Sequence, residues 1–336
     1  MASHVEANTW LPVMPEAAFD LVTEPSRLRR WLMVAGHIDV TVGGDVHLVV
    51  APGAHAVGTV TEVEPGRRFG YTHGWVGDEG LPPGSSEVTV TLEPERNGTR
   101  VTVRHHGIPQ TEQAGMQQGW RSFMGRLKAL VSGRVNTRDW PAMLDVASAH
   151  STLDAAFYAL LHALRAVDPD DLSKSTPCPD FTIGDLVIHL VENGQMLGGV
   201  MSADVPDPDA VDRAGDPEGA VAAALWPCVA AAEALAPQHK IDIGGHAVTG
   251  EEVVRYLSVE FLVHAWDITR ALDIDLDASA ELCGAVLANA EATRSTPFFG
   301  EDTSGTAQFD APVDPDPAAT ALDRLIALTG RQVRRT

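Results

Sequence analysis

The sequence predicts a two-domain α+β protein, in which an antiparallel sheet folded around a long helix is followed by a helical domain. Three observations lead to this prediction. Short β-type runs separated by turn residues fill the first part of the chain and end in one long amphipathic segment. Beyond about residue 138 the chain changes to Ala- and Leu-rich segments with helical spacing. The charge changes at the same point, because residues 1–137 carry 12 basic and 14 acidic side chains whereas residues 138–336 carry 12 and 32.

The first domain is expected over residues 1–137 and begins with a strand over residues 4–13. Pro15 starts a helix, since proline is favoured in the first helical turn, and a second short helix carries Trp31. The domain closes with a helix over residues 110–135, where apolar side chains recur at helical spacing. Between these helices, turn residues separate β-type runs, and strands are expected over residues 38–42, 46–50, 56–63, 68–73, 87–92 and 100–105.

This order of elements is that of a helix-grip fold, in which an antiparallel sheet curls around the last helix. Four motifs follow one another along the chain: Leu28-x-x-Trp31, the turn Gly43-Gly44, the strand start Arg67-Arg68-Phe69, and Gly119-Trp120-x-x-Phe123. In this order they resemble the START-type (SRPBCC) superfamily, especially the branch similar to activators of a heat-shock chaperone ATPase. The resemblance covers residues 4–135.

The resemblance implies a domain that binds an apolar small molecule between its sheet and its long helix. The expected ligand pocket has aromatic walls, contributed by Trp31, Phe69, Trp120 and Phe123. The same four side chains can equally be plain core. Four further ring side chains could line the cavity, namely His73, Trp75, His105 and His106. A chaperone partner is not expected, and an interaction protein that works through this domain is kept as an alternative.

The second domain, residues 138–336, is expected to be helical. One of its helices follows Phe181, with Thr182 as the N-cap and Asp185 three residues later in a capping arrangement. A short extended piece covers residues 241–243, and residues 305–317 are loop-like. The remaining helices are expected over residues 145–166, 217–234, 249–272, 278–292 and 318–328.

Two helices of this domain carry side chains that bind metals. Glu260 and His264 lie four residues apart, so both project from one face of their helix. His189 lies in the helix that follows Thr182. If the two helices are neighbours, two imidazoles and one carboxylate converge, a ligand set that suits zinc, nickel, manganese or ferrous iron and leaves positions open for water or substrate. The alternative interpretation of the spacing alone is a surface ion pair.

Two acidic residues stand one helical turn from the histidines and could orient them. Asp267 follows His264, and Asp185 precedes His189. Each carboxylate could accept a hydrogen bond from the ring nitrogen that does not face the metal. We therefore expect both carboxylates to orient the metal-ligating histidines.

The segments around these residues resemble a known family. They read Thr-Pro-Cys-Pro-Asp-Phe-Thr-Ile-Gly-Asp-Leu-Val-Ile-His-Leu at 176–190 and Glu-Phe-Leu-Val-His-Ala-Trp-Asp at 260–267. In this order they resemble the signatures of the mycothiol-dependent maleylpyruvate isomerase family, within the DinB-like superfamily, and the ending at 323–331 is similar to the tail of actinobacterial members. The resemblance implies a four-helix bundle, a divalent metal that is usually zinc, held here by His189, Glu260 and His264, and mycothiol or a similar thiol as cosubstrate.

Together these features predict a metal-dependent, mycothiol-using isomerase or thiol S-transferase that acts on a small electrophile. The alternative is a non-catalytic small-molecule-binding or stress-response protein with a vestigial or structural metal site. Arg255, Arg270 and Arg294 could bind carboxylates of a substrate or thiol, or they could form simple surface ion pairs.

Composition narrows the partners and the location. The net charge is −22, and 12 basic against 32 acidic side chains give the second domain −20 of it. Such a surface repels phosphate backbones and anionic lipids, so neither nucleic acid nor a membrane is an expected partner. Three cysteines without a Cys-x-x-Cys motif fit a reducing compartment. Since neither a membrane span nor a signal-peptide pattern is visible, a cytoplasmic location is expected.

Overall fold

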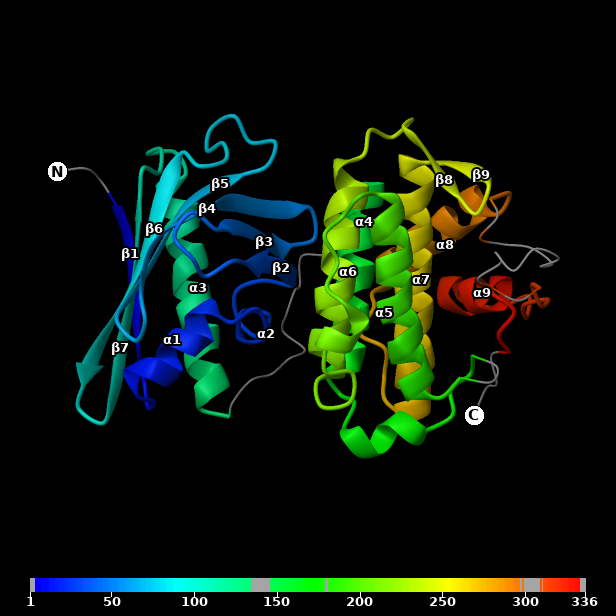
Figure 1. The fold of residues 1–336 in the computed structure, drawn as a ribbon, viewed down its shortest axis with the longest axis horizontal. Helices are drawn as coiled ribbons and strands as arrows, with labels where there is room; N and C mark the ends of the chain where they lie inside the picture. The colour runs from blue at the N-terminus through cyan, green and yellow to red at the C-terminus, as the bar shows by residue number, and fades with distance from the viewer. Residues whose placement is uncertain are drawn as a thin grey trace. The chain divides into compact units, whose positions relative to one another are not determined.

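A computed structural model describes residues 4–133, 146–178, 181–296, 298, 309 and 311–332. The chain divides into two compact units, Met1–Met143 and Leu144–Thr336 (Figure 1). The first is built around a sheet and the second is helical, so the predicted two-domain α+β class is confirmed. The predicted boundary between residues 137 and 138 lies outside the described residues and stays a prediction.

The first unit contains a seven-stranded sheet in which every neighbouring pair of strands is antiparallel. Its strand order is β1-β7-β6-β5-β4-β3-β2, so the chain meanders from β2 to β7 and places β1 beside β7. The strands are β1 His4–Leu11, β2 Ala35–Ile38, β3 Asp45–Ala51, β4 Ala54–Glu64, β5 Arg68–Trp75, β6 Ser86–Glu95 and β7 Gly98–His106.

One face of this sheet is covered by helices, and the core lies between them (Figure 1). Short helices α1 Pro15–Thr23 and α2 Pro25–Leu28 precede the meander, and α3 Gln113–Val131 closes the unit and packs along β1. Helix α3 buries Trp120, Met124 and Leu127 on the face turned to the sheet. The predicted antiparallel sheet with a long closing helix is therefore present.

The strand expected over residues 38–42 is wrong, because the strand ends at Ile38. The following residues form the turn into β3, where the Asp39 N–H donates to the Asp45 carbonyl at 2.9 Å. Gly43 has a φ of +90°, which only glycine adopts readily. A Cβ on Gly44 would lie 2.4 Å from the Asp39 carbonyl oxygen. The turn through the two glycines is therefore wider than the sequence pattern suggested. Strand β2 ends before this turn and pairs with β3, which follows it.

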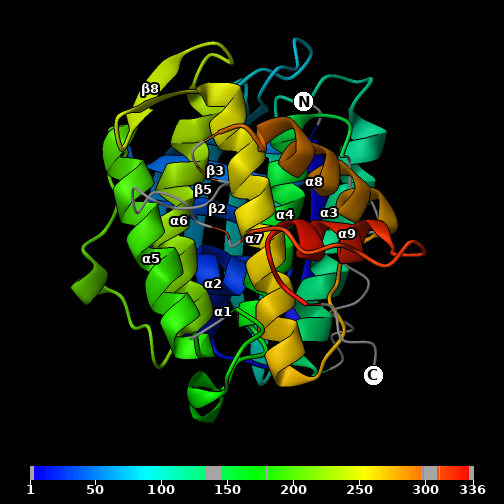
Figure 2. The same cartoon turned by 90° about the vertical axis from the view of Figure 1, so that its right-hand side faces the viewer.

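The second unit is built from long helices and one small hairpin (Figures 1 and 2). Helix α4 packs along α7, and α5 packs along α6. The short extended piece expected over residues 241–243 is strand β8 Lys240–Ile243, which pairs with β9 His246–Thr249 in a hairpin before α7. The helices are α4 Ala149–Leu164, α5 Ile183–Val200, α6 Pro217–Ala234, α7 Gly250–Leu272, α8 Ala280–Thr293 and α9 Ala321–Leu328, with single 3₁₀ turns at Pro169–Ser173 and Pro208–Ala210.

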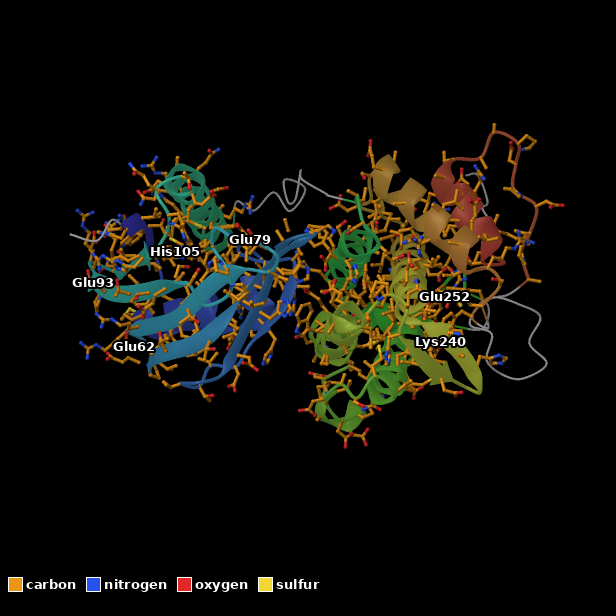
Figure 3. The ribbon with its side chains drawn as sticks, turned by 90° about the horizontal axis from the view of Figure 1, so that it is seen from above. Glu62, Glu79, Glu93, His105, Lys240 and Glu252 are labelled. Carbon is orange, nitrogen blue, oxygen red and sulfur yellow. The ribbon has the colours of Figure 1, made fainter. Side chains whose placement is uncertain are left out.

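Side-chain caps set where these helices begin. Ser148 caps α4 through a reciprocal box with Ser151, so the helix starts at Ala149 and not near residue 145 as predicted. Thr182 and Asp185 form the predicted box at the start of α5. Thr249 and Glu252 form another at the start of α7, and Figure 3 labels Glu252 there. A cap fixes the first residue of a helix, and therefore how far along the helix axis each later side chain lies. This applies to α5 and α7, which carry the predicted metal ligands.

Among the described helices, none combines the length and apolarity needed to cross a membrane.

Candidate metal centre

The structure brings His189, Glu260 and His264 together, although 71 residues separate the first from the second. Helix α5 supplies His189, and α7 supplies the other two from one face. Glu260 Oε1 lies 2.9 Å from His189 Nε2 and 3.2 Å from His264 Nε2. The donor atoms of all three side chains lie within 4.8 Å of one another. Two imidazole nitrogens and a carboxylate oxygen thus share one small volume.

The orientation of His264 is set by Asp267. His264 Nδ1 donates to Asp267 Oδ2 at 3.0 Å, so this nitrogen carries a hydrogen. His264 Nε2 lies 3.2 Å from Glu260 Oε1, but it is buried and makes no well-aligned hydrogen bond. A buried ring nitrogen without a well-aligned partner is costly, and a cation between it and the carboxylate would satisfy both groups. The three side chains therefore fit a divalent metal.

Asp267 is itself held by Arg331, which the sequence reasoning did not assign to the site. Arg331 Nε lies 2.9 Å from Asp267 Oδ1 and 3.0 Å from Oδ2, and Nη2 donates to Oδ2 at 2.8 Å. Only 4% of Arg331 and none of Asp267 is exposed. The pair is thus a buried bidentate ion pair directly behind the His264 ring.

Two further polar side chains contact Glu260, and both were also missed. The Tyr256 hydroxyl donates to Glu260 Oε2 at 3.2 Å, and Asn193 Nδ2 donates to Oε1 at 2.9 Å. Tyr256 precedes Glu260 by four residues, and Asn193 follows His189 by four. That helical spacing was a usable signal, since such residues share a helix face.

The electrostatics of the site favour a bound positive charge. Burial raises the pKa of Glu260, but the neighbouring His264 and His189 outweigh it and hold the pKa well below its usual range. Burial lowers the pKa of His264, but the Glu260 charge and the hydrogen bond to Asp267 outweigh it and raise the pKa to about 9. Without a metal ion, protonated His264 supplies the positive charge beside the Glu260 carboxylate that the metal would otherwise supply.

Asp185 does not support His189 in the way that the spacing predicts. Its carboxylate accepts from the Thr182 N–H at 2.9 Å and the Thr182 hydroxyl at 2.6 Å, which completes the cap of α5. Among the described residues it makes no hydrogen bond to His189, whose ring instead stands edge-on to Phe181 at 5.8 Å. The Asp185 carboxylate is therefore used for the helix cap and not for His189, because the capping partner lies only three residues away in the sequence.

Three arginines were considered as binders of substrate carboxylates, and the structure gives hydrogen-bond partners for Arg255. Arg255 donates to Glu251 at 2.7 Å and to Asn289 at 3.0 Å, which ties α7 to α8. Arg270 and Arg294 are exposed at the ends of their helices. The ion-pair interpretation therefore holds for Arg255.

The four aromatic residues predicted to wall a pocket in the first unit all pack in its core. Trp31, Phe69 and Trp120 are buried there, and Phe123 is half-buried against them. The Trp120 indole donates to His105 Nδ1 at 3.2 Å. Figure 3 labels His105 among the side chains of the first unit. Their role as pocket walls stays a prediction.

Two family models match the chain in sequence order. Residues 12–132 match "Activator of Hsp90 ATPase homolog 1-like protein", and residues 153–269 match "Mycothiol maleylpyruvate isomerase N-terminal domain". Two Mycobacterium tuberculosis proteins, the uncharacterized proteins Rv0738 of strain H37Rv and MT0763 of strain CDC 1551, are each 30% identical over 191 residues. The aligned part is 57% of this chain and 100% of each relative.

Among solved structures, the AHSA1-like protein of Rhizobium etli is 32% identical over 43% of this chain and 91% of its own, with a TM-score of 0.36. DynU16, from the dynemicin biosynthetic locus, is 27% identical over 39% of this chain but only 48% of its own, with a TM-score of 0.34. The chain thus joins a domain of the Hsp90-ATPase-activator type to a domain of the mycothiol maleylpyruvate isomerase type, and it belongs to the same family as the two mycobacterial proteins.

Proposed function

We propose that the second unit is a metal-dependent enzyme that uses mycothiol or a similar thiol to isomerise, or to transfer the thiol to, a small electrophile. In this proposal α4, α5, α6 and α7 form a DinB-like four-helix bundle, and His189, Glu260 and His264 hold the metal, most simply zinc. The observation that carries it is the orphaned Nε2 of buried His264 beside the Glu260 carboxylate. The match to the isomerase family over residues 153–269 supports the same site.

The chemistry follows from the donor set. A divalent metal with three protein ligands can hold a thiol as its thiolate, which is the nucleophilic form. Glu260 and His264 are almost fully buried, whereas 23% of the His189 side chain is exposed. A thiol and its electrophile therefore reach the donors from the α5 side.

The reaction class has two branches. In an isomerisation, the thiol sulfur adds to a conjugated double bond, the resulting single bond rotates, and the thiol leaves as the double bond re-forms. In an S-transfer, the carbon–sulfur bond persists after a proton is added or a leaving group is expelled. Both branches need the same activated thiol, which is why the site supports them together.

For the first unit we propose the binding of an apolar small molecule, as the predicted pocket of Trp31, Phe69, Trp120 and Phe123 requires. The supporting observation is His73, a buried histidine whose Nδ1 has no hydrogen-bond partner. A ligand oxygen could satisfy this nitrogen. Nitrogen NMR of the His73 side chain, recorded with and without added p-cresol, tests this; an unchanged signal counts against it.

The metal proposal is tested by elemental analysis of the purified chain. We expect about one equivalent of zinc or a related metal in the natural protein and none in His264→Ala. The matched control is His162→Ala, because His162 is a partly exposed helix histidine that pairs with Asp277 at 3.6 Å. Equal metal in all three proteins would contradict the assignment, and metal without turnover of any thiol and electrophile pair would favour the non-catalytic binding protein.

A further inference from the structure

A buried amide lies among the proposed metal ligands. Asn193 follows His189 by one turn of α5 and is 8% exposed. Its Nδ2 lies 2.9 Å from Glu260 Oε1 and 3.1 Å from His189 Nε2. One side-chain group therefore contacts two of the three donor atoms.

These contacts cannot all be hydrogen bonds at once. The contact of 2.9 Å between His189 Nε2 and the Glu260 carboxylate requires a hydrogen on Nε2. A protonated Nε2 cannot accept from the Asn193 amide. Turning the amide over lets Oδ1 accept from Nε2, but Oδ1 then faces Glu260 Oε1, a second acceptor. Either orientation of the amide therefore leaves two donors, or two acceptors, in contact.

A cation removes this conflict. With the amide turned over, Asn193 Oδ1 takes the place of Nδ2, next to His189 Nε2 and Glu260 Oε1, which lie 2.9 Å from each other. His264 Nε2 lies 3.2 Å from the same Glu260 oxygen. Ligands bound at about 2.0–2.1 Å around a tetrahedral ion lie roughly 3.3 Å apart. The contacts of Asn193 to Glu260 and His189, at 2.9 and 3.1 Å, are close to that separation.

We infer that Asn193 is a fourth protein ligand of the metal, binding through its amide oxygen. The inference rests on the proposed metal site and specifies how that site is closed. A neutral amide is a weak ligand compared with imidazole or carboxylate, so an incoming thiolate displaces it. Asn193 then lowers the affinity of the site for thiols while it raises the affinity for the metal.

The test uses the full chain, freed of metal and titrated with Co²⁺, with N-acetylcysteine as the thiol probe. Competition with a chromophoric chelator gives the cobalt affinity, and the sulfur-to-cobalt charge-transfer absorption gives the thiol affinity. In Asn193→Ala we expect cobalt to bind about tenfold more weakly and N-acetylcysteine about tenfold more tightly. A general structural defect would weaken both, so the opposite signs identify a ligand.

Two more variants complete the experiment. Gln195→Ala is the matched control, because Gln195 lies on the same helix and uses its amide to bond the Pro206 carbonyl at 2.9 Å. It should behave as the natural protein. Asn193→Asp supplies a charged oxygen and should reverse both effects. Unchanged affinities in Asn193→Ala, or affinities that fall together, overturn the inference alone. No cobalt binding by the natural protein overturns the proposed function with it.

Discussion

Arg331 and Asp267 form a buried bidentate ion pair across 64 residues, with distances of 2.8 to 3.0 Å between guanidinium and carboxylate. Asp267 also accepts from His264, so three side chains form one continuous chain of hydrogen bonds. The guanidinium compensates a carboxylate that is otherwise fully buried, and the carboxylate fixes the imidazole. Arg331 thereby helps to orient His264, a ligand of the proposed metal centre.

Replacing Arg331 with Gln should strongly destabilise the second unit. The substitution leaves Asp267 buried without its counter-charge, which costs about 3–5 kcal/mol in the free energy of unfolding. Urea unfolding of the metal-free protein measures this loss. The control is Arg324→Gln in the same tail, because Arg324 pairs with Glu291 at the surface and should cost less than about 1 kcal/mol. Equal losses in the two variants would show that the buried pair is not special.

Asp185 and Asp267 should respond differently to the loss of their carboxylates. Asp185→Asn removes one partner of a helix cap, so we expect a loss of about 1 kcal/mol of stability and no change in metal affinity. Asp267→Asn weakens the orientation of His264 and should lower metal affinity about 10- to 100-fold. Cobalt titration of both variants makes the comparison. A comparable loss of metal affinity in Asp185→Asn would restore its predicted role behind His189.

The sequence predicted the parts of the site that depend on helical spacing. Glu260 and His264 share a face because they lie four residues apart, and the caps at Thr182 and Thr249 set where α5 and α7 begin. Arg331 could not be found in this way, because no local pattern connects it with Asp267. Its place depends on how the chain after α8 packs back on α7, which is a tertiary effect.

Two predictions from the sequence were wrong, and in both cases a neighbouring part of the chain is the cause. Asp185 has one carboxylate, and the nearby N-terminus of α5 takes it before His189 can. At residues 38–42 the strand propensity of the side chains loses to the geometry of the turn through Gly43. Propensity and spacing describe what a residue can do, but a neighbour in the structure decides which option is realised.

Tyr256→Phe should weaken the metal site without unfolding the helix. The substitution removes the donor to Glu260 Oε2, but the ring keeps its stacking on Phe298, with centroids 3.9 Å apart. We expect metal affinity to fall about tenfold, since one hydrogen bond to a charged acceptor is worth about 1.5 kcal/mol. Tyr71→Phe, which changes a buried tyrosine of the first unit, is the control for cobalt affinity. An unchanged affinity in Tyr256→Phe would mean that Glu260 needs no support from this hydroxyl.

The first unit should lose stability in acid because of two buried histidines. Burial lowers the pKa of His73 to about 4, and burial together with the nearby His73 and His106 lowers the pKa of His105 to about 3. His105 accepts from the Trp120 indole and contacts the Ser86 hydroxyl at 2.8 Å, an arrangement that its neutral form satisfies. In the unfolded chain both rings titrate near 6.5.

Between pH 6.5 and about 4 the unfolded state therefore binds protons that the folded state does not. The free energy of unfolding should fall as the pH falls through this window, by on the order of 3 kcal/mol for each histidine at its lower end. Tryptophan fluorescence in urea titrations from pH 7 to pH 4 measures the slope. In His73→Phe, which keeps a ring beside Trp75, the slope should drop by about half, since one of the two titrating groups is gone. A slope equal to that of the natural protein would mean that His73 is protonated in the folded state and that another group causes the acid sensitivity.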